Sequence, residues 1–545
     1  MEHYDYVIVG AGSAGSVLAN RLSKNNKHKV LILEAGGNDS SFWIRMPIGY
    51  GKIYYDTRFN WKFETEPEQN LDSNRMYWPR GKVLGGSSSI NAMVYVRGHP
   101  NDYNDWAKSS PGWDWEHMAP IFKKMEDWTG VKHELRGQGG PLTVRDISKD
   151  VHPLCQTYLD AAGQAGIPLN SDYNAKDMEG AALYQITTKN GFRASASRAY
   201  LHPVKKRSNL TLSLKSHVTK VLFDGKRAVG IEYIKGNKKY NVKISSEVIL
   251  CGGAINSPQL LQLSGVGPQA LLKNFDIPVI SDSANVGENL QDHMGASIYY
   301  KSKVPTLNQS LGSFWGKLNV GINYVLRRKG PLSLSVNQGG GFVRAQKGSL
   351  FPDTQIYFSP VSYTRAPSGT RPLMSPDPFP GFLLGFNPCK PTSRGFVKIK
   401  SKDPLEAPMM YGNYLSTNHD RLLMRDGMKL MRKIGQTPAL QSIIESELSP
   451  GTEVKTDEDF DEFVRANSWT VYHQCGTCRM GTDPKKSVVD ERLKVHGIIG
   501  LRVVDASIFP SVPTGNTNGP TIAVAENAAS MIIEDAAALE KVHEN

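Results

Sequence analysis

Cysteine is scarce in this chain. Its 545 residues include only five cysteines, too scattered for a disulfide framework: Cys155, Cys251, Cys389, Cys475 and Cys478. Such usage is typical of a reducing compartment and predicts the cytoplasm. The single CxxC, Cys475 to Cys478, has no second pair to complete a zinc site, so no metal is expected. A redox role for the pair is disfavoured, because the short βαβ context of thioredoxin-like motifs is missing.

Targeting signals and long apolar runs are lacking too. The first residues carry no basic segment before an apolar stretch, so no signal peptide is predicted. No run of ~20 apolar residues occurs that could cross a membrane. Lys and Arg number 64 against 52 Asp and Glu, a net charge of +12. The basic clusters, at 205–207, 235–239 and 327–329, have no interleaved aromatics, which disfavours a nucleic-acid partner. Peripheral contact with the inner face of a membrane stays open.

Length and composition predict a globular protein of more than one domain. An ordinary domain has ~100–200 residues, and this chain has 545. Apolar residues make up 39% and charged residues 21%, which excludes a disordered protein and a coiled coil. Two packed domains, or one domain with a large insertion, are therefore expected.

A strand, a glycine turn, a helix and a second strand open the chain. An apolar run over 5–9 leads into Gly10-Ala-Gly12-Ser-Ala-Gly15, and a helical stripe follows over 16–23. A second apolar run ends at Glu34. Glycines here allow a tight turn and close approach to a pyrophosphate, and the acid can accept from ribose hydroxyls. The unit predicts a bound dinucleotide, FAD or NAD rather than NADP because position 34 is acidic.

Two further glycine-rich blocks follow. Residues 78–93 are rich in Gly and Ser, so their backbone amides are candidates to line a cofactor, with a structural turn as the alternative. They do not form a P-loop. In the second block, 247–259, a strand meets a Gly-Gly turn, and a helix is expected over 259–263 with Pro258 near its first turn. Strands are expected just before this block, with a hairpin turn at Asp224-Gly225.

Residues 300–465 differ in pattern from the rest. Strands alternate at 354–358 and 396–400 as in antiparallel sheets, and 418–435 has a helical pattern. We expect a substrate-facing domain on an antiparallel sheet. Tyr357, Phe358 and Tyr363 are candidates to line its pocket, with packing in the sheet core as the alternative. A buried strand at 501–505 and a helix from 521 to 538 end the chain.

Two polar clusters stand near the C-terminus. His473 lies within residues 471–481, and Asn516 and Asn518 lie within 515–521. Taken alone, His473 is more often a hydrogen-bonded structural histidine. The asparagines alone are more often turn or cap residues.

In combination these motifs resemble the glucose–methanol–choline (GMC) flavoprotein oxidoreductases, and among them the bacterial choline-dehydrogenase-like alcohol dehydrogenases. The resemblance rests on Gly10 to Gly15 with Glu34, on blocks 81–91, 252–267, 285–293 and 504–507, and on the two C-terminal clusters. It implies an α/β Rossmann-like FAD-binding domain plus an α+β substrate domain on an antiparallel sheet. The expected FAD-binding segments are 1–155, 205–299 and 466–545, with a substrate-side insertion at 156–204 and a substrate-binding domain at 300–465.

The resemblance also implies the site residues. His473 is the implied catalytic base and Asn516 its partner. The implied cofactor-binding residues are Gly10, Gly12, Ser13, Ala14, Gly15, Glu34, Ala35, Gly81, Val83, Gly86, Ser87, Asn91, Ala92, Met93, Val94, Val218, Gly252, Asp505, Ala506, Asn518 and Thr521. Ile90 stands where some relatives have a histidine that binds FAD covalently, so non-covalent FAD is expected. Gln474 and Cys475 depart from the Pro and Val usual beside the base.

The implied reaction is oxidation of a primary alcohol to an aldehyde, with hydride passing to flavin N5. A neutral imidazole is a natural proton acceptor near pH 7, and an asparagine can hydrogen-bond the substrate oxygen. Electrons would pass to an acceptor other than oxygen, such as a quinone. An oxygen-using oxidase, a non-redox lyase that contains FAD and an NAD-linked enzyme remain alternatives. No carboxylate in 300–465 can be assigned to a quaternary ammonium, so choline is not favoured over other primary alcohols.

Overall fold

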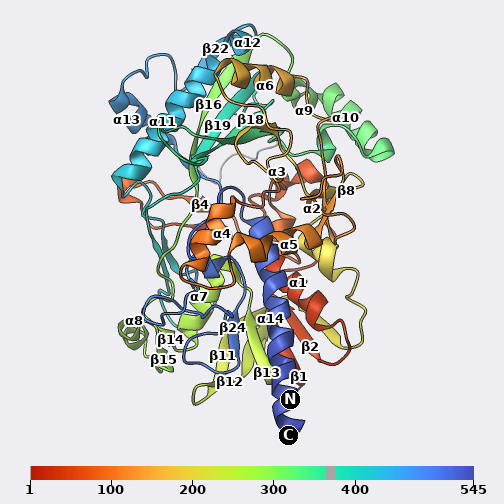
Figure 1. Ribbon diagram of the computed structural model, residues 1–545, viewed down its shortest axis with the longest axis vertical. Helices are drawn as coiled ribbons and strands as arrows, with labels where there is room; N and C mark the ends of the chain where they lie inside the picture. Colours follow the sequence, from red (N-terminus) through yellow and green to blue (C-terminus); the bar gives the residue numbers. More distant parts are fainter. Residues whose placement is uncertain (1, 364–375, 545) are drawn as a thin grey trace.

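Two large sheets organise the computed structural model, which describes residues 2–363 and 376–544 (Figure 1). The first sheet, low in Figure 1, has the order β10-β2-β1-β13-β12-β11, and β24 also pairs with β13. Its strands are β1 (His3–Val9), β2 (Val30–Glu34), β10 (Leu210–Leu214), β11 (Ser216–Asp224), β12 (Arg227–Lys235), β13 (Lys238–Leu250) and β24 (Leu501–Val503). The pairs β10-β2, β2-β1, β1-β13 and β13-β24 are parallel. This is the Rossmann-like half that the sequence predicts.

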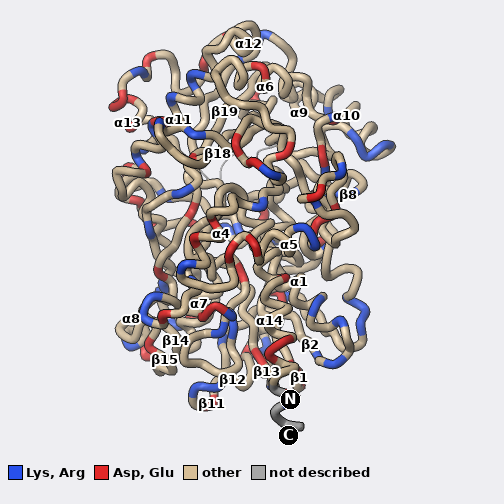
Figure 2. The backbone as a smooth tube through the Cα atoms, in the orientation of Figure 1, with Lys and Arg blue, Asp and Glu red and all other residues tan. Residues whose placement is uncertain are grey.

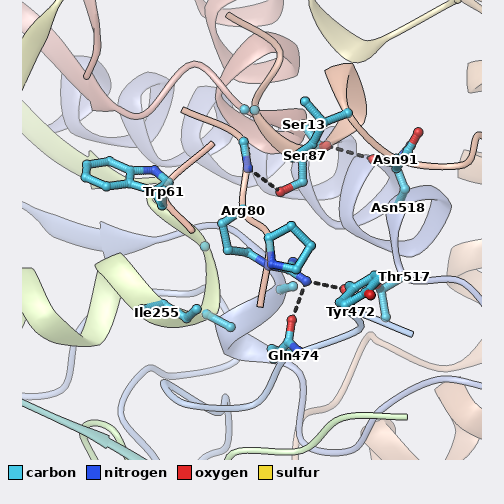
Figure 3. Close-up of a pocket in the computed structure, with 18 of the residues that line it drawn as sticks. Ser13, Trp61, Arg80, Ser87, Asn91, Ile255, Tyr472, Gln474, Thr517 and Asn518 are labelled. Atoms are coloured by element: carbon cyan, nitrogen blue, oxygen red, sulfur yellow. Dashed lines mark hydrogen bonds between the residues drawn. The ribbon is translucent and has the colours of Figure 1, made fainter. Parts of the chain in front are cut away.

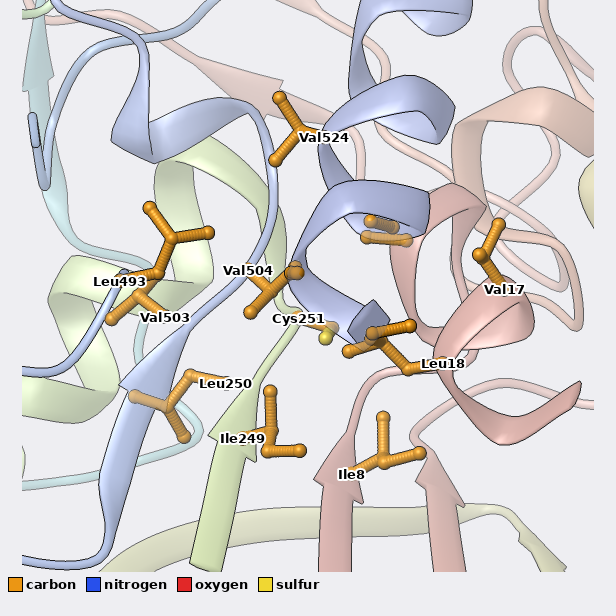
Figure 4. Close-up of a cluster of buried hydrophobic side chains, with 14 of the residues drawn as sticks. Ile8, Val17, Leu18, Ile249, Leu250, Cys251, Leu493, Val503, Val504 and Val524 are labelled. Carbon is orange, nitrogen blue, oxygen red and sulfur yellow. The ribbon is translucent and has the colours of Figure 1, made fainter. Parts of the chain in front are cut away.

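Helices cover this sheet and bury its apolar strands. Helix α1 (Ser13–Leu22) follows β1 and packs against the long terminal helix α14 (Asn518–Glu544). Strand β2 is buried along its whole length, as expected for a parallel strand covered on both faces. Figure 4 shows the resulting core, in which Ile8 lies near Leu18 while Ile249 and Val504 face the same cluster.

The second sheet, in the upper half of Figure 1, is antiparallel throughout. Its order is β22-β16-β19-β18-β17-β7, with β23 paired to β16. Its strands are β7 (Gly180–Leu183), β16 (Met294–Ser302), β17 (Gly339–Val343), β18 (Thr354–Ser359), β19 (Gly381–Pro388), β22 (Ile444–Ser449) and β23 (Trp469–Thr470). Helices α6 (Leu154–Gln164) and α11 (Asn418–Gly435) pack on it. The antiparallel substrate half is therefore confirmed, whereas the five segment boundaries stay a prediction.

Some local expectations need correction. Helix α7 (Gly253–Leu263) starts six residues before the expected 259, so Pro258 lies inside it. Proline has no N–H for the carbonyl of Ala254, and the Thr477 hydroxyl donates to that carbonyl instead at 2.6 Å. The expected strand at 396–400 is the short β20 (Phe396–Lys398), which pairs only with β21 (Met409–Tyr411), apart from the large sheet. The hairpin turn after Asp224 is confirmed.

The remaining helices and strands lie outside these two sheets and their main covering helices. The helices are α2 (Phe42–Arg45), α3 (Tyr50–Ile53), α4 (Pro100–Ala107), α5 (Trp115–Met125), α8 (Gln269–Asn274), α9 (Leu307–Gly312), α10 (Phe314–Arg327), α12 (Pro438–Gln441) and α13 (Asp457–Asn467). The short strands are β3 (Phe63–Glu64), β4 (Tyr77–Trp78), β5 (Glu126–Trp128), β6 (Leu142–Val144), β8 (Thr188–Lys189), β9 (Phe192–Arg193), β14 (Val266–Gly267) and β15 (Ser281–Asp282). None of the helices in the described ranges is both long and apolar enough to span a bilayer.

Candidate active site

One cavity of about 450 Å³ is lined by residues of both sheets. Its lower wall includes Val9, Glu34 and Leu250, at the carboxyl ends of three parallel strands. Its upper wall includes Tyr299 of β16 and Tyr357 of β18. Ligands of open α/β sheets bind at this edge of the strands, so the cavity is the candidate site.

The glycine turn leaves the start of α1 free for an anion. Gly10 has φ +102°, and a Cβ there would lie 2.5 Å from the carbonyl oxygen of Cys251. The N-cap residue is Gly12, so no N-cap side chain accepts from the first N–H groups of α1, and the first turn has no acidic residue. The first N–H groups of α1 therefore stay available for a pyrophosphate. The turn thus fits a dinucleotide.

Glu34 is held in place by the backbone of two loops. Its carboxylate accepts from Ala11 N at 3.0 Å and from Gly36 N at 2.7 Å. Burial raises its pKa to about 7, an effect that these two hydrogen bonds partly offset. An acceptor fixed at the end of β2 suits the ribose hydroxyls of a dinucleotide.

The structure gathers nearly all the sequence-predicted site residues around this cavity. Those that line it are Gly10, Gly12, Ser13, Ala14, Glu34, Ala35, Gly81, Gly86, Ser87, Asn91, Ala92, Met93, Val94, Val218, Gly252, His473, Asp505, Ala506, Asn516, Asn518 and Thr521. Gly15 and Val83 do not. A Cβ at Gly15 would lie 1.9 Å from the carbonyl oxygen of Gly10, so this glycine serves close packing of helix on turn. Val83 is buried in a neighbouring apolar cluster.

The starts of α1 and α14 meet beside the cavity. Ser13 Oγ donates to Asn518 Oδ1 at 2.7 Å, and Figure 3 shows the two side chains facing each other. Asp505 ties the start of α7 to the end of β24, because its carboxylate accepts from Gly253 N at 2.8 Å and from Ser257 Oγ at 2.6 Å. Three helix starts therefore surround one cavity.

A hydrogen-bonded chain fixes the proton positions on His473. His293 Nε2 lies 2.9 Å from the carbonyl oxygen of Cys389, which can only accept, so Nε2 holds the proton. His293 Nδ1 is then an acceptor, and it lies 2.8 Å from His473 Nδ1, which must donate. His473 Nε2 is left with a lone pair. Asn516 Nδ2 donates to it at 3.1 Å, while Asn516 Oδ1 accepts from Gln355 Nε2 at 3.1 Å.

The environment keeps His473 neutral. Burial, and then the neighbours His293 and Arg80, lower its pKa well below the ordinary value. Burial also lowers the pKa of His293 to about 4. A buried, neutral imidazole with a lone pair on a cavity-lining side chain is equipped to accept a proton.

Four residues that support the base were not predicted as site residues: Asp292, His293, Gln474 and Arg80. Asp292 accepts from His473 N at 2.7 Å and from Gln474 Nε2 at 2.8 Å. Gln474 Oε1 accepts from the half-buried guanidinium of Arg80, which also donates to the carbonyl of Tyr472 (Figure 3). Gln474, which stands where the resemblance implies Pro, thus bridges a buried carboxylate and a half-buried cation. The only signal for His293 and Asp292 is their place at the end of the 285–293 motif.

Aromatic residues dominate the cavity near His473. They are Tyr50, Tyr54, Tyr55, Tyr77, Tyr299, Tyr357, Tyr363, Trp469 and Tyr472. Tyr357 and Tyr363 therefore line the pocket, whereas Phe358 packs in the sheet core, where its ring stacks on Tyr158 at 5.1 Å. Arg80 is the one Lys or Arg in the described lining, and the two carboxylates there, Glu34 and Asp505, already bond backbone amides.

A dinucleotide cradle and a neutral imidazole in one cavity define a nucleotide-cofactor oxidoreductase. The chain belongs to the GMC oxidoreductase family, whose N-terminal model matches residues 4–295 and whose C-terminal model matches 391–525. The predicted enzyme class and FAD as cofactor are thereby confirmed, while the mode of FAD attachment stays a prediction.

Similar proteins cover nearly the whole chain. An oxygen-dependent choline dehydrogenase of Vibrio vulnificus is 42% identical over 98% of this chain and 94% of its own. An alcohol dehydrogenase [acceptor] of Pseudomonas putida is 42% identical over 97% and 96%. Among solved structures, a pyridoxine 4-oxidase described as from Mesorbium loti matches with TM-score 0.87 and 30% identity over 96% of this chain and 98% of its own. A formate oxidase matches with TM-score 0.91 and 26% identity over 98% of both.

Proposed function

We propose that this oxidoreductase converts an uncharged, apolar primary alcohol to its aldehyde. The observation that carries the proposal is the lone pair of His473 Nε2, held on a neutral imidazole beside Asn516 at the cavity. When the alcohol binds, its hydroxyl takes the place of the Asn516 N–H at the lone pair of His473 Nε2, which then takes the hydroxyl proton. Asn516 Nδ2, released from His473, donates to the alcohol oxygen.

FAD, when bound, supplies the acceptor for the hydride that leaves the alcohol carbon. The residues that would hold it run from Glu34 and Val218, through the start of α1, to the segment around Asn91. The alcohol loses two hydrogens and two electrons. One hydrogen leaves as a proton to His473, and the other leaves as a hydride, with both electrons, to the cofactor. Ile90 lines the cavity and has no nucleophilic atom, so we propose non-covalent binding.

The charges near the base favour a neutral substrate over choline. Arg80 lies beside His473 and contributes to its lowered pKa. Burial lowers the pKa of Arg80 itself only to about 10, so it stays a cation at neutral pH. A quaternary ammonium would face this cation with no free carboxylate in the described lining to neutralise it. Aromatic rings can hold an ammonium group as well as an alkyl or aryl group, so the charge of Arg80 is what favours an uncharged substrate.

A panel of primary alcohols with a dye as electron acceptor tests the substrate proposal. Benzyl alcohol and medium-chain alcohols should give kcat/KM about tenfold or more above that of choline. A preference for choline would contradict it.

We further propose that electrons leave to an acceptor other than oxygen, such as a quinone. Support comes from the similarity to an alcohol dehydrogenase [acceptor]. Reduced enzyme mixed with air-saturated buffer should reoxidise much more slowly than it turns over with the dye. Reoxidation as fast as turnover would instead identify an oxidase.

A further inference from the structure

Helix α10 has an apolar face that no other part of the described chain covers. Of its 14 residues only Val320 and Tyr324 are buried. Six large apolar side chains are exposed: Phe314 (73%), Trp315 (75%), Leu318 (45%), Ile322 (50%), Val325 (57%) and Leu326 (76%). They recur every three or four residues, so they share one side of the helix. Contiguous apolar surface of this kind marks an interaction site, unlike singly scattered apolar residues.

The charge around this face has one sign. No Asp or Glu occurs between Asp292 and Asp353, a stretch that contains all of α10. Lys317, Arg327 and Lys329 are exposed on or next to the helix. Figure 2 shows the outer end of α10 as a basic segment at the periphery of the molecule.

We propose that α10 docks on the surface of a bilayer that contains anionic lipid. An interfacial helix buries an apolar face among acyl chains while basic residues meet the headgroups, and aromatic residues sit at the boundary. Phe314 and Trp315 at one end of α10 and Arg327 with Lys329 at the other supply these parts. A second copy of the chain fits less well, because the same stretch on that copy has no Asp or Glu to pair with these basic residues.

The docking face lies behind the wall of the candidate active site. The buried side of α10, Val320 and Tyr324, belongs to one apolar cluster with Tyr50, Ile90 and Met93. These last three residues line the cavity. A bilayer under α10 would therefore place the cavity close to lipid-soluble molecules.

Co-sedimentation of the FAD-loaded protein with vesicles tests the proposal without any turnover. The vesicles are phosphatidylcholine alone, or phosphatidylcholine with about 30 mol % phosphatidylglycerol. The native protein should sediment with the anionic vesicles at low salt and be released at high salt. The triple variant Trp315→Ser/Leu318→Ser/Leu326→Ser should bind at least about tenfold more weakly.

Two further variants test whether vesicle binding depends on the basic residues and on the α10 face in particular. Arg327→Ser/Lys329→Ser should lose the preference for anionic vesicles. Val131→Ser/Leu350→Ser, which removes apolar side chains that are 85% and 82% exposed elsewhere, should bind like the native protein. All variants should keep native FAD content and melting temperature, which shows that they fold.

Several results would overturn the proposal. Native protein that stays in the supernatant with both vesicle types is one, and equal vesicle binding by the α10 triple variant is another. A dimer that forms in solution without lipid, binds no vesicles and is abolished by the triple variant would assign the face to a second copy. Because binding is measured without substrate, failure of the alcohol-oxidation proposal would leave these results unchanged.

Discussion

At the scale of single residues, His293 decides which nitrogen of His473 has the lone pair. Replacing it with Leu removes the acceptor of the His473 Nδ1 proton, and flavin reduction should slow by tenfold or so. His293 also lowers the pKa of His473, so in the variant that pKa rises and the acidic loss of rate moves to higher pH. Anaerobic stopped-flow reduction across pH, normalised to bound FAD, measures both effects.

A matched variant separates the role of His293 as a hydrogen-bond acceptor for His473 from its role in packing. His293→Gln offers a carbonyl oxygen to the same donor and should recover part of the rate. If both variants reduce flavin with the native rate and pH profile, His293 has no part in setting the tautomer.

Glu34 should control FAD affinity in a pH-dependent manner. Glu34→Ala removes a charge-assisted acceptor, which should weaken FAD binding by about 1.5–3 kcal/mol. The pKa of this carboxyl is about 7, so as the pH falls through 7 it takes up a proton and the native affinity should fall. Titration of apoprotein with FAD at several pH values tests this. A native affinity that is flat over this range, or equal to that of Glu34→Ala, would rule out a ribose contact.

At the scale of elements, two glycines of one turn have separable roles. A Cβ at Gly12 would meet only Gly86 Cα at 3.8 Å, an ordinary contact, yet Gly12 lines the cavity. Gly12→Ala should therefore fold with a near-native melting temperature but bind FAD more weakly. A Cβ at Gly15 would lie 1.9 Å from the Gly10 carbonyl oxygen, so Gly15→Ala should lower the melting temperature strongly. Circular dichroism melts and FAD titration of both variants check this, and the reverse pattern would contradict it.

Element prediction from the sequence succeeds where a pattern is local. The glycine turn, the hairpin after Asp224 and the helix over Asn418–Gly435 all follow from short-range signals. The start of α7 is predicted too late, because a proline is expected near the first turn of a helix. In the structure Pro258 lies inside α7, and the hydroxyl that replaces its missing N–H donor comes from Thr477, 223 positions away in sequence from Ala254. Such compensation cannot be read from local pattern.

At the scale of the whole molecule, long-range pairing limits what the sequence can predict. Strand β7 near residue 180 joins a sheet whose other strands lie beyond residue 293. His293 meets His473 only because β23 pairs with β16, whose first residue follows His293. The glycines and His473 can therefore be predicted from motifs, whereas the chain that orients the base becomes visible only in the folded molecule.

The purified protein should be yellow and release its FAD on denaturation. Ile90 offers no atom for a covalent bond to the flavin. Acid precipitation should leave the absorbance of free FAD in the supernatant and a colourless pellet. Flavin that stays with the precipitated chain would contradict non-covalent binding.

The central claim is that His473 is the base, and single-turnover anaerobic reduction of bound FAD by an alcohol tests it most directly. His473→Ala should keep FAD and fold while reduction slows by ~10²–10⁴-fold. Because the pKa of His473 is lowered, the native rate should be flat near neutral pH and fall only in acid, and His473→Ala should lack that fall. Asn516→Ala should be slower but keep the pH dependence, since asparagine does not titrate. A His473→Ala protein that reduces its FAD at the native rate would contradict the account.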